Sequence, residues 1–245
     1  MKILIPTAKE LNLDLPAQAG SALSSLSQQV VDSLATYAEA DLEAFYKISP
    51  ERASEEYQRI QALKSGQAEL YPAVQLFDGL MYRNIKRQDL TDQEENYLRD
   101  KVLITSALYG IIPAFTAIAP HRLDFLMKLK VDGKSLKTYW KSAYDQAVEG
   151  EEVLLSLLSS EFETVFSKPV RERMLTFKFM ENRAGILKIH STISKKARGA
   201  FLTALMEQQV EDLAALKNLT FAGFSYREDL SSEQEFAFVK DVYTL

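Results

Sequence analysis

The chain has 245 residues and a formal net charge of −5, and hydrophobic residues make up 47% of it. This composition is typical of a globular protein and excludes collagen, wholesale disorder and a highly charged solvating tail. The length exceeds one typical domain of roughly 150 residues but does not reach two. Because the sequence contains no repeat and no linker, we expect a single domain over residues 1–245.

The chain has no cysteine and only two histidines, His121 and His190. Thiol peroxidases, zinc fingers and thiolate-ligated iron–sulfur proteins are therefore excluded, because their chemistry needs cysteine. Neither histidine has a glutamate three residues before it, so the half-site of carboxylate-bridged di-iron proteins is missing too. We expect no metal site and no cofactor.

The sequence contains no segment that approaches the run of about 18 apolar residues needed by a membrane helix. Its start, Met1–Glu10, lacks the long apolar stretch of a signal peptide. We therefore expect a cytoplasmic protein without a membrane partner. The pattern does not indicate an oligomeric state.

Apolar runs and turn residues predict an alternation of strands and helices. Strands are expected at residues 2–5, 102–105, 153–158, 175–180, 186–190, 220–226 and 235–240. A hairpin loop at 181–185 joins two of these strands. Helices are expected in much of 16–66, at 91–100, at 135–148, from Ser160, and at 194–216, the longest of them. This order predicts an α/β (mixed α+β) fold with a central mixed sheet flanked by helices.

Capping residues predict where three helices begin. Ser21 is a candidate cap for the first helix, and Ser49 precedes Pro50, which suits a first helical position. Thr91 and Glu94 have the spacing of a capping box. These signals place helix starts near residues 21, 50 and 91.

Positive charge is concentrated in residues 168–198, which hold nine lysines and arginines against two glutamates. In an acidic chain this asymmetry indicates an anion or nucleic-acid footprint, or else a hairpin whose charges simply face water. Lys195, Lys196 and Arg198 lie at the expected start of the longest helix, where the helix dipole disfavours cations. A bound phosphate would resolve this conflict, and Gly199 would let a ligand or a neighbouring backbone approach closely. The alternative is that these cations pair with acidic loops elsewhere.

A second candidate site follows the strand at 102–105, where Tyr109 and Gly110 come after small polar residues. Ligands of open α/β sheets bind beyond the carboxyl ends of strands, and small residues leave room for them there. The segment Leu108–Pro113 also has the apolar, glycine, apolar spacing of the hairpin in helix-hairpin-helix DNA-binding motifs. The second glycine of that motif is replaced by Ile112.

Six segments, taken in order along the chain, resemble the YaaA family of bacterial peroxide-stress proteins. They are IPTAK at 5–9, FDGLMY at 77–82, SALYG at 106–110, PHRLD at 120–124, SSEF at 159–162 and KKARG at 195–199. The tail from Gly223 fits as well, so the resemblance spans essentially the whole chain. It implies an α/β domain with a positively charged cleft that binds DNA, a helix-hairpin-helix-like element, and a hydroperoxide response linked to limiting free iron. It implies no established reaction.

The sequence departs from the family pattern at several polar positions. Pro113–Thr116 stand where the family usually has an arginine followed by Pro-Leu-Asp, and Leu80 replaces an aspartate. The usual Ser-Pro-Ala-Lys is Pro6–Lys9, and the usual Pro-Tyr-Arg is Pro120–Arg122. Either the cleft performs no chemistry, or this branch has altered or abandoned it.

Three functions remain open at this point. We favour a stress protein without catalytic activity that binds DNA or another phosphate-bearing ligand without reading bases. Its anion-binding residues would be Lys9, Tyr109, Gly110, Arg122, Lys195, Lys196, Arg198 and Gly199. The second function is an enzyme on a phosphorylated or nucleotide-like small molecule, with Tyr109, His121 or Glu161 as proton carrier. The third is a vestigial cleft or a surface for a protein partner.

Overall fold

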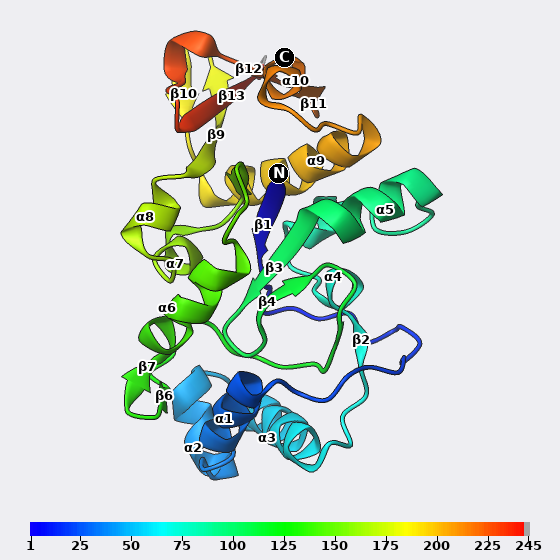
Figure 1. Ribbon diagram of the computed structural model, residues 1–245, viewed down its shortest axis with the longest axis vertical. Coiled ribbons are helices and arrows are strands. Elements are labelled where there is room, and N and C mark those ends of the chain that lie inside the picture. The colour runs from blue at the N-terminus through cyan, green and yellow to red at the C-terminus, as the bar shows by residue number, and fades with distance from the viewer. Residues whose placement is uncertain (243–245) are drawn as a thin grey trace.

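The structure, a computed structural model, describes residues 1–242, which contain one mixed β-sheet of nine strands (Figure 1). The strands are β1 (Lys2–Pro6), β3 (Val102–Ser106), β4 (Gly110–Pro113), β8 (Leu154–Ser156), β9 (Met174–Arg183), β10 (Ile186–Lys188), β11 (Thr220–Phe221), β12 (Phe224–Tyr226) and β13 (Glu235–Asp241). They are paired in the order β11-β12-β13-β9-β8-β1-β3-β4, and β10 pairs with β9 outside this row. Because β1 is parallel to both β3 and β8, the first strand lies inside the sheet.

Helices cover both faces of this sheet. One face carries α1 (Ser25–Leu34), α2 (Glu39–Tyr46), α3 (Pro50–Ser65), α6 (Leu136–Ala147), α7 (Ser160–Glu163) and α8 (Lys168–Arg171). The other carries α4 (Ala73–Leu76), the 3-10 turn η1 (Tyr82–Asn84), α5 (Asp92–Lys101), α9 (Ser191–Glu207) and α10 (Leu213–Asn218). In Figure 1, α1 to α3 gather at the lower end, and β9, β12 and β13 form the upper end. The predicted fold, a central mixed sheet flanked by helices, is confirmed.

Smaller elements complete the description of residues 1–242. The strands β2 (Tyr71–Pro72) and β5 (Ala117–Ile118) form one two-stranded ladder, and β6 (Lys130–Val131) and β7 (Lys134–Ser135) form another. A second 3-10 turn, η2 (Glu228–Leu230), precedes β13. These elements lie outside the central sheet.

The alternation of side chains along β1 explains why both faces of the sheet are covered. Ile3 and Ile5 pack into the core on the side of α5 and α9, whereas Leu4 packs with α1, α3 and α6 on the opposite side. All three side chains are fully buried. A strand buried on both faces has a continuous apolar sequence, and this pattern predicted the strand.

Two of the three capping signals locate a helix start correctly. Helix α3 begins at Pro50, directly after Ser49. Thr91 caps α5, and the predicted capping box forms, because the Glu94 carboxylate accepts a hydrogen bond from the Thr91 N–H at 2.8 Å. These starts depend on contacts between residues that are close in sequence, so the sequence alone predicts them.

The first helix begins later than predicted. Its cap is Ser24, whose Oγ accepts a hydrogen bond from the Ser27 N–H at 3.1 Å, and Ser21 lies outside the helix. The preceding segment is extended because Gln18 pairs with Leu70 in an isolated β-bridge. This pairing with a distant segment overrides the local capping signal.

Residues 102–113 form a β-hairpin, in place of the helix-hairpin-helix-like element that was expected. Strand β4 returns antiparallel to β3, with Gly110 opposite Ser106. The Oγ of Ser106 accepts hydrogen bonds from the N–H groups of Leu108 and Tyr109 and stabilises the turn. Because both elements that flank the glycine are strands, the assignment of Leu108–Pro113 to that motif is wrong.

Helix α9 begins and ends earlier than predicted. His190 is its cap, and the Nδ1 atom of His190 accepts a hydrogen bond from the Thr192 N–H at 3.3 Å. The Ser194 N–H already donates to the His190 carbonyl at 2.9 Å, so Lys195 lies inside the helix, beyond its free N–H groups. The predicted cradle of free backbone N–H groups at Lys195 and its neighbours is therefore wrong.

Phenylalanine side chains fix α9 against the sheet. The ring centroid of Phe201 lies 4.7 Å from that of Phe177 and 5.2 Å from that of Phe238. The ring of Phe221 also lies 5.2 Å from Phe201. Aromatic pairs of this kind contribute about 0.5–1.5 kcal/mol each beyond the burial of their surface. These contacts set which way the other faces of α9 point.

At Gly199, α9 lies very close to the backbone near η1. A β-carbon at this position would lie 2.2 Å from the carbonyl oxygen of Met81 and 2.8 Å from the β-carbon of Asn84. The glycine therefore makes room for a neighbouring backbone and not for a ligand. This outcome decides between the two roles that the sequence left open.

We predict that Gly199→Ala destabilises the protein by about 1–3 kcal/mol. Alanine normally gains about 1 kcal/mol over glycine inside a helix, but here the added methyl group forces the helix and η1 apart. Urea denaturation of both proteins measures the difference in the free energy of unfolding. An unfolding midpoint at higher urea concentration in the variant would contradict the prediction.

Candidate ligand-binding cleft

The loops that follow β1 and β8 line a cleft of about 390 Å³. The chain passes from β1 to β3 on one side, and β8 lies on the other side of β1. In α/β sheets, such a reversal of strand order opens a crevice beyond the carboxyl ends of the strands, where ligands bind. Lys9 reaches this cleft after β1, and Glu161 reaches it after β8.

An ion pair joins the loop after β1 to the segment 120–129. The Nζ atom of Lys9 lies 2.9 Å from Oδ2 of Asp124, whose exposed fraction is 8%. The other carboxylate oxygen, Oδ1, accepts a hydrogen bond from the Leu126 N–H at 3.0 Å. Both oxygens of Asp124 are therefore engaged within the protein.

Within residues 1–242, only one of the two carboxylate oxygens of Glu161, on α7, accepts a hydrogen bond. Its Oε1 accepts a hydrogen bond from the Phe125 N–H at 3.0 Å. Burial and the negative charge of Asp124 raise the pKa of Glu161, against the opposing effects of the Phe125 hydrogen bond and of Lys9. Within residues 1–242, Oε2 accepts no hydrogen bond. This second oxygen is free to accept one from a ligand.

Helix α9 supplies the cations Lys195 and Arg198, which lie three residues apart on one face. Burial lowers the pKa of Arg198, but an arginine remains protonated in proteins. The charge of Glu163 acts on this guanidinium, while Oε1 of Glu163 accepts a hydrogen bond from Ser156 Oγ at 2.7 Å. Arg198 itself forms no ion pair and no side-chain hydrogen bond in the described part of the chain. It is a half-buried cation with available donors.

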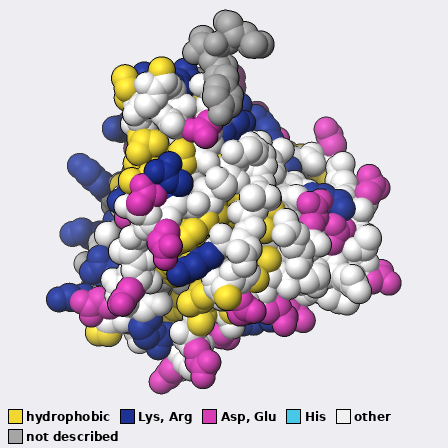
Figure 2. Space-filling view, turned by 90° about the horizontal axis from the view of Figure 1, so that it is seen from above, with side chains coloured by type: hydrophobic (Ala, Val, Ile, Leu, Met, Phe, Trp, Pro, Cys, Tyr) yellow, Lys and Arg dark blue, Asp and Glu magenta, His cyan; other side chains and the backbone are white. Residues whose placement is uncertain are grey.

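The cleft is balanced in charge and is not predominantly basic. Three cations and three acids line it, namely Lys9, Lys195, Arg198, Glu10, Asp124 and Glu161. Leu80, which stands where the family pattern has an aspartate, also contributes to the wall. In Figure 2, which shows the upper surface, several Lys and Arg side chains lie along the left margin and acidic side chains are more frequent on the right. The positively charged cleft implied by the resemblance is not seen in this lining.

Tyr109 and Gly110 lie outside the cleft. The hydroxyl of Tyr109 accepts a hydrogen bond from the Ala119 N–H at 2.9 Å. Gly110 lies against Trp140, where a β-carbon would approach a ring carbon to 2.7 Å, and the Trp140 Nε1–H donates to the Ala107 carbonyl at 2.7 Å. Helix α6 thus closes the turn after β3 on the side of Gly110, whereas Tyr109 lines a separate pocket of about 510 Å³ together with residues 18–24 and 115–117.

His121 also lies away from the cleft. Its exposed fraction is 5%, and its ring packs between those of Phe77 and Tyr109. Burial lowers its pKa to about 4, so the imidazole is neutral at pH 7. Its Nδ1 atom lies 2.8 Å from the Ala119 carbonyl oxygen and donates a hydrogen bond to it when protonated. This position does not suit a proton carrier in the cleft.

The remaining predicted residues lie outside the lining of the cleft. Arg122 does not line it, although the next two residues, Leu123 and Asp124, do. Lys196 lines a separate groove beside Phe224 and Lys240, on another side of α9. Of the eight residues predicted to bind an anion, the cleft brings together Lys9, Lys195 and Arg198.

Ion pairs neutralise part of the positive charge of residues 168–198. Arg183 pairs with Glu181 at 2.7 Å, within the same strand. Lys178 pairs with Glu235, which comes from the neighbouring strand β13. The second pair joins residues far apart in sequence, so the count of charges in this segment overstates its free positive charge.

Sequence reasoning missed Asp124, although it noticed the segment that contains this residue. A single aspartate carries no signal for chemistry on its own. Its neighbours Leu123 and Phe125 are apolar and buried, and an acid between two core residues is an indication of a partner nearby. That partner, Lys9, is more than a hundred residues away in the sequence.

Metal and membrane signals are lacking in residues 1–242. No three histidine, aspartate or glutamate side chains there are grouped closely enough to hold a metal ion. None of the helices there combines the length and the apolar character needed to cross a bilayer. The carboxylates of Asp124 and Glu161 are instead engaged by backbone N–H groups and, for Asp124, by Lys9.

The cleft residues fall within a region of strong similarity to known proteins. The family model for peroxide stress protein YaaA matches residues 1–230. A UPF0246 protein of Streptococcus pneumoniae (strain CGSP14) is 64% identical over 242 residues, which are 99% of this chain and 100% of that protein. Another UPF0246 protein, from Streptococcus pneumoniae (strain ATCC 700669 / Spain 23F-1), is 65% identical over the same length.

We predict that His121 makes the protein less stable as the pH falls from 7 to 5. Folding lowers its pKa from 6.5 to about 4, so the unfolded chain binds a proton that the folded chain does not. Between pH 7 and pH 5, the titration of His121 lowers the free energy of unfolding by about 2 kcal/mol. Urea unfolding at both pH values measures it, with His121→Gln as the control that lacks the titrating group. If the variant shows the same pH dependence as the original chain, the prediction is wrong.

Proposed function

This chain belongs to the family of peroxide stress protein YaaA, and we propose that it acts in the peroxide response by binding a phosphate-bearing ligand in the cleft. The proposal rests mainly on Arg198. This half-buried cation lines the cleft and forms no ion pair within residues 1–242. Because Arg198 is only half-buried, its guanidinium is open to a ligand, and a phosphate can accept two parallel hydrogen bonds from it. Lys195, on the same face of α9, adds a second positive charge.

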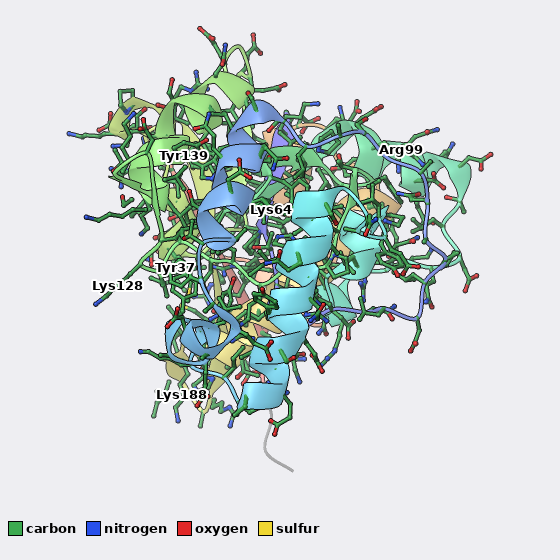
Figure 3. All side chains as sticks on the ribbon, turned by 90° about the horizontal axis from the view of Figure 1, so that it is seen from below. Tyr37, Lys64, Arg99, Lys128, Tyr139 and Lys188 are labelled. Carbon is green, nitrogen blue, oxygen red and sulfur yellow. The ribbon has the colours of Figure 1, made fainter. Side chains whose placement is uncertain are left out.

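Nucleic acid is one source of such a phosphate. Lys195 stands at the cleft, Lys196 in the next groove, and Lys188 on β10, where Figure 3 shows it at the margin of the molecule. None of these three lysines forms an ion pair with the described residues. Contacts of this type hold the phosphate backbone and do not read the bases.

The proposed protection against peroxide is indirect. Reduction of peroxide by a protein thiol needs a cysteine, and this chain has none. We propose that ligand binding limits iron-dependent oxidative damage and that the chain does not consume the peroxide.

Glu161 favours a second function, that of an enzyme. Among the three proton-carrier candidates, Tyr109 and His121 lie outside the cleft, and Glu161 lines it. A carboxyl group whose pKa is raised by burial suits a general acid. Such an enzyme would hold a phosphorylated small molecule through Arg198 and Lys195, and Glu161 would donate a proton to it.

We predict that Arg198→Ala weakens the binding of inorganic phosphate and of a DNA duplex by about ten- to a hundredfold. The variant loses a charge-assisted contact worth about 1.5–3 kcal/mol. Calorimetry for phosphate and fluorescence anisotropy for labelled DNA measure the two affinities.

Lys196→Ala is the matched control for the phosphate titration, because it removes the same charge from the same helix but lines a different groove. If both variants weaken phosphate binding equally, net charge and not the cleft controls affinity. Repeating the DNA titration over a range of salt concentrations separates the ligand classes, because several phosphate contacts give a steep loss of affinity with salt.

We also predict that the purified chain neither consumes hydrogen peroxide without an added cofactor nor binds Fe(II) stoichiometrically at submicromolar affinity. The reason is that it has no cysteine and two histidines that are far apart in sequence. Peroxide consumption assays and anaerobic equilibrium dialysis with Fe(II) measure these properties. Either activity would overturn the indirect role.

A further inference from the structure

We propose that the cleft binds a small phosphate monoester whose other end carries hydroxyl or amino groups, a molecule of the size of a mononucleotide. This inference rests on the function proposed above and narrows its ligand. It depends on two polar groups of the cleft that have no partner within residues 1–242, the guanidinium of Arg198 and the Oε2 atom of Glu161. One is a donor and the other an acceptor.

The neighbouring polar groups of the cleft are already satisfied by each other. Asp124 uses Oδ2 for Lys9, at 2.9 Å, and Oδ1 for the Leu126 N–H, at 3.0 Å. This pair therefore offers little to a ligand. The Oε1 atom of Glu161 is likewise used by the Phe125 N–H. Of the charged groups that line the cleft, the guanidinium of Arg198, the ammonium group of Lys195 and one carboxyl oxygen of Glu161 remain for a ligand.

The free guanidinium and the free carboxyl oxygen come from different walls of the cleft. Arg198 comes from α9, and Glu161 comes from α7, which follows β8 on the opposite face of the sheet. A ligand that satisfies both groups must therefore bridge the cleft, with an anion at one end and a hydrogen-bond donor at the other.

The size and charge of the cleft favour a small molecule over a polymer. Pockets for small ligands have volumes of about 300–1,000 Å³, and the cleft measures about 390 Å³. A nucleic-acid groove binder needs a predominantly basic surface, whereas acids equal cations here. Asp124 is paired with Lys9 and Glu10 with Arg83, so the unpaired cations of the lining are Lys195 and Arg198, which suffice for a single phosphate but not for the successive phosphates of a polymer.

Calorimetry with the full chain and three phosphate esters tests the proposal. Methyl phosphate has no hydroxyl or amino donor, ribose 5-phosphate adds hydroxyl groups, and AMP adds a base with an amino group. We expect ribose 5-phosphate or AMP to bind at least tenfold more tightly than methyl phosphate. Glu161→Gln should remove this advantage, so that ribose 5-phosphate and AMP bind to the variant no more tightly than methyl phosphate does. Arg198→Ala should weaken all three ligands, and Lys196→Ala should weaken none.

Each contrary outcome has a distinct meaning. If the three esters bind equally to the original chain, the proposal is overturned, and this result does not depend on whether any variant folds. If Glu161→Gln retains its melting temperature and also the preference for AMP, Glu161 is not the acceptor and the proposal fails. If Arg198→Ala binds every phosphate normally, the proposed function itself fails. If a DNA duplex binds and excess AMP does not displace it, a polymer site is favoured and the inference is wrong.

Discussion

The burial of β1 on both faces is the constraint on which the rest of the structure depends. Ile3 and Ile5 require a helical layer on one side, and Leu4 requires another on the opposite side. With β3 and β8 hydrogen-bonded along its two edges, β1 has no free edge or face. Polar groups can therefore gather only where the strand ends. The cleft opens at that end, because the chain leaves β1 there and the strand order reverses.

Local patterns predicted most strands of the central sheet and two of three helix starts, since these depend on neighbouring residues. The apolar run of β1 and the capping box at Thr91 are examples. The prediction failed where a distant segment decides the outcome. The start of α1 is set by a bridge between Gln18 and Leu70, and a turn with one glycine became a β-hairpin because its flanks joined the sheet.

The candidate site was predicted in part for the same reason. Lys9, Lys195 and Arg198 were expected to bind an anion, and they do line one cleft. Their acidic neighbours could not be assigned from the sequence, because Asp124 meets Lys9 only through the folding of the sheet. The net charge of a sequence segment can be counted from the sequence. The electrostatic potential in a cleft depends instead on which segments the fold brings together there. A site that looked basic along the chain is balanced in space.

The close packing of Gly199 has a consequence for the entropy of binding. The residue next to Arg198 is held against the backbone of Met81, and the next turns of the helix are held by Phe201. A cation on such a clamped helix has little main-chain freedom left to lose, so a ligand would have to order only the terminal part of one side chain. If the packing at Gly199 were loosened, the binding of an anion at Arg198 would carry a larger loss of conformational entropy, although Gly199 itself does not line the cleft.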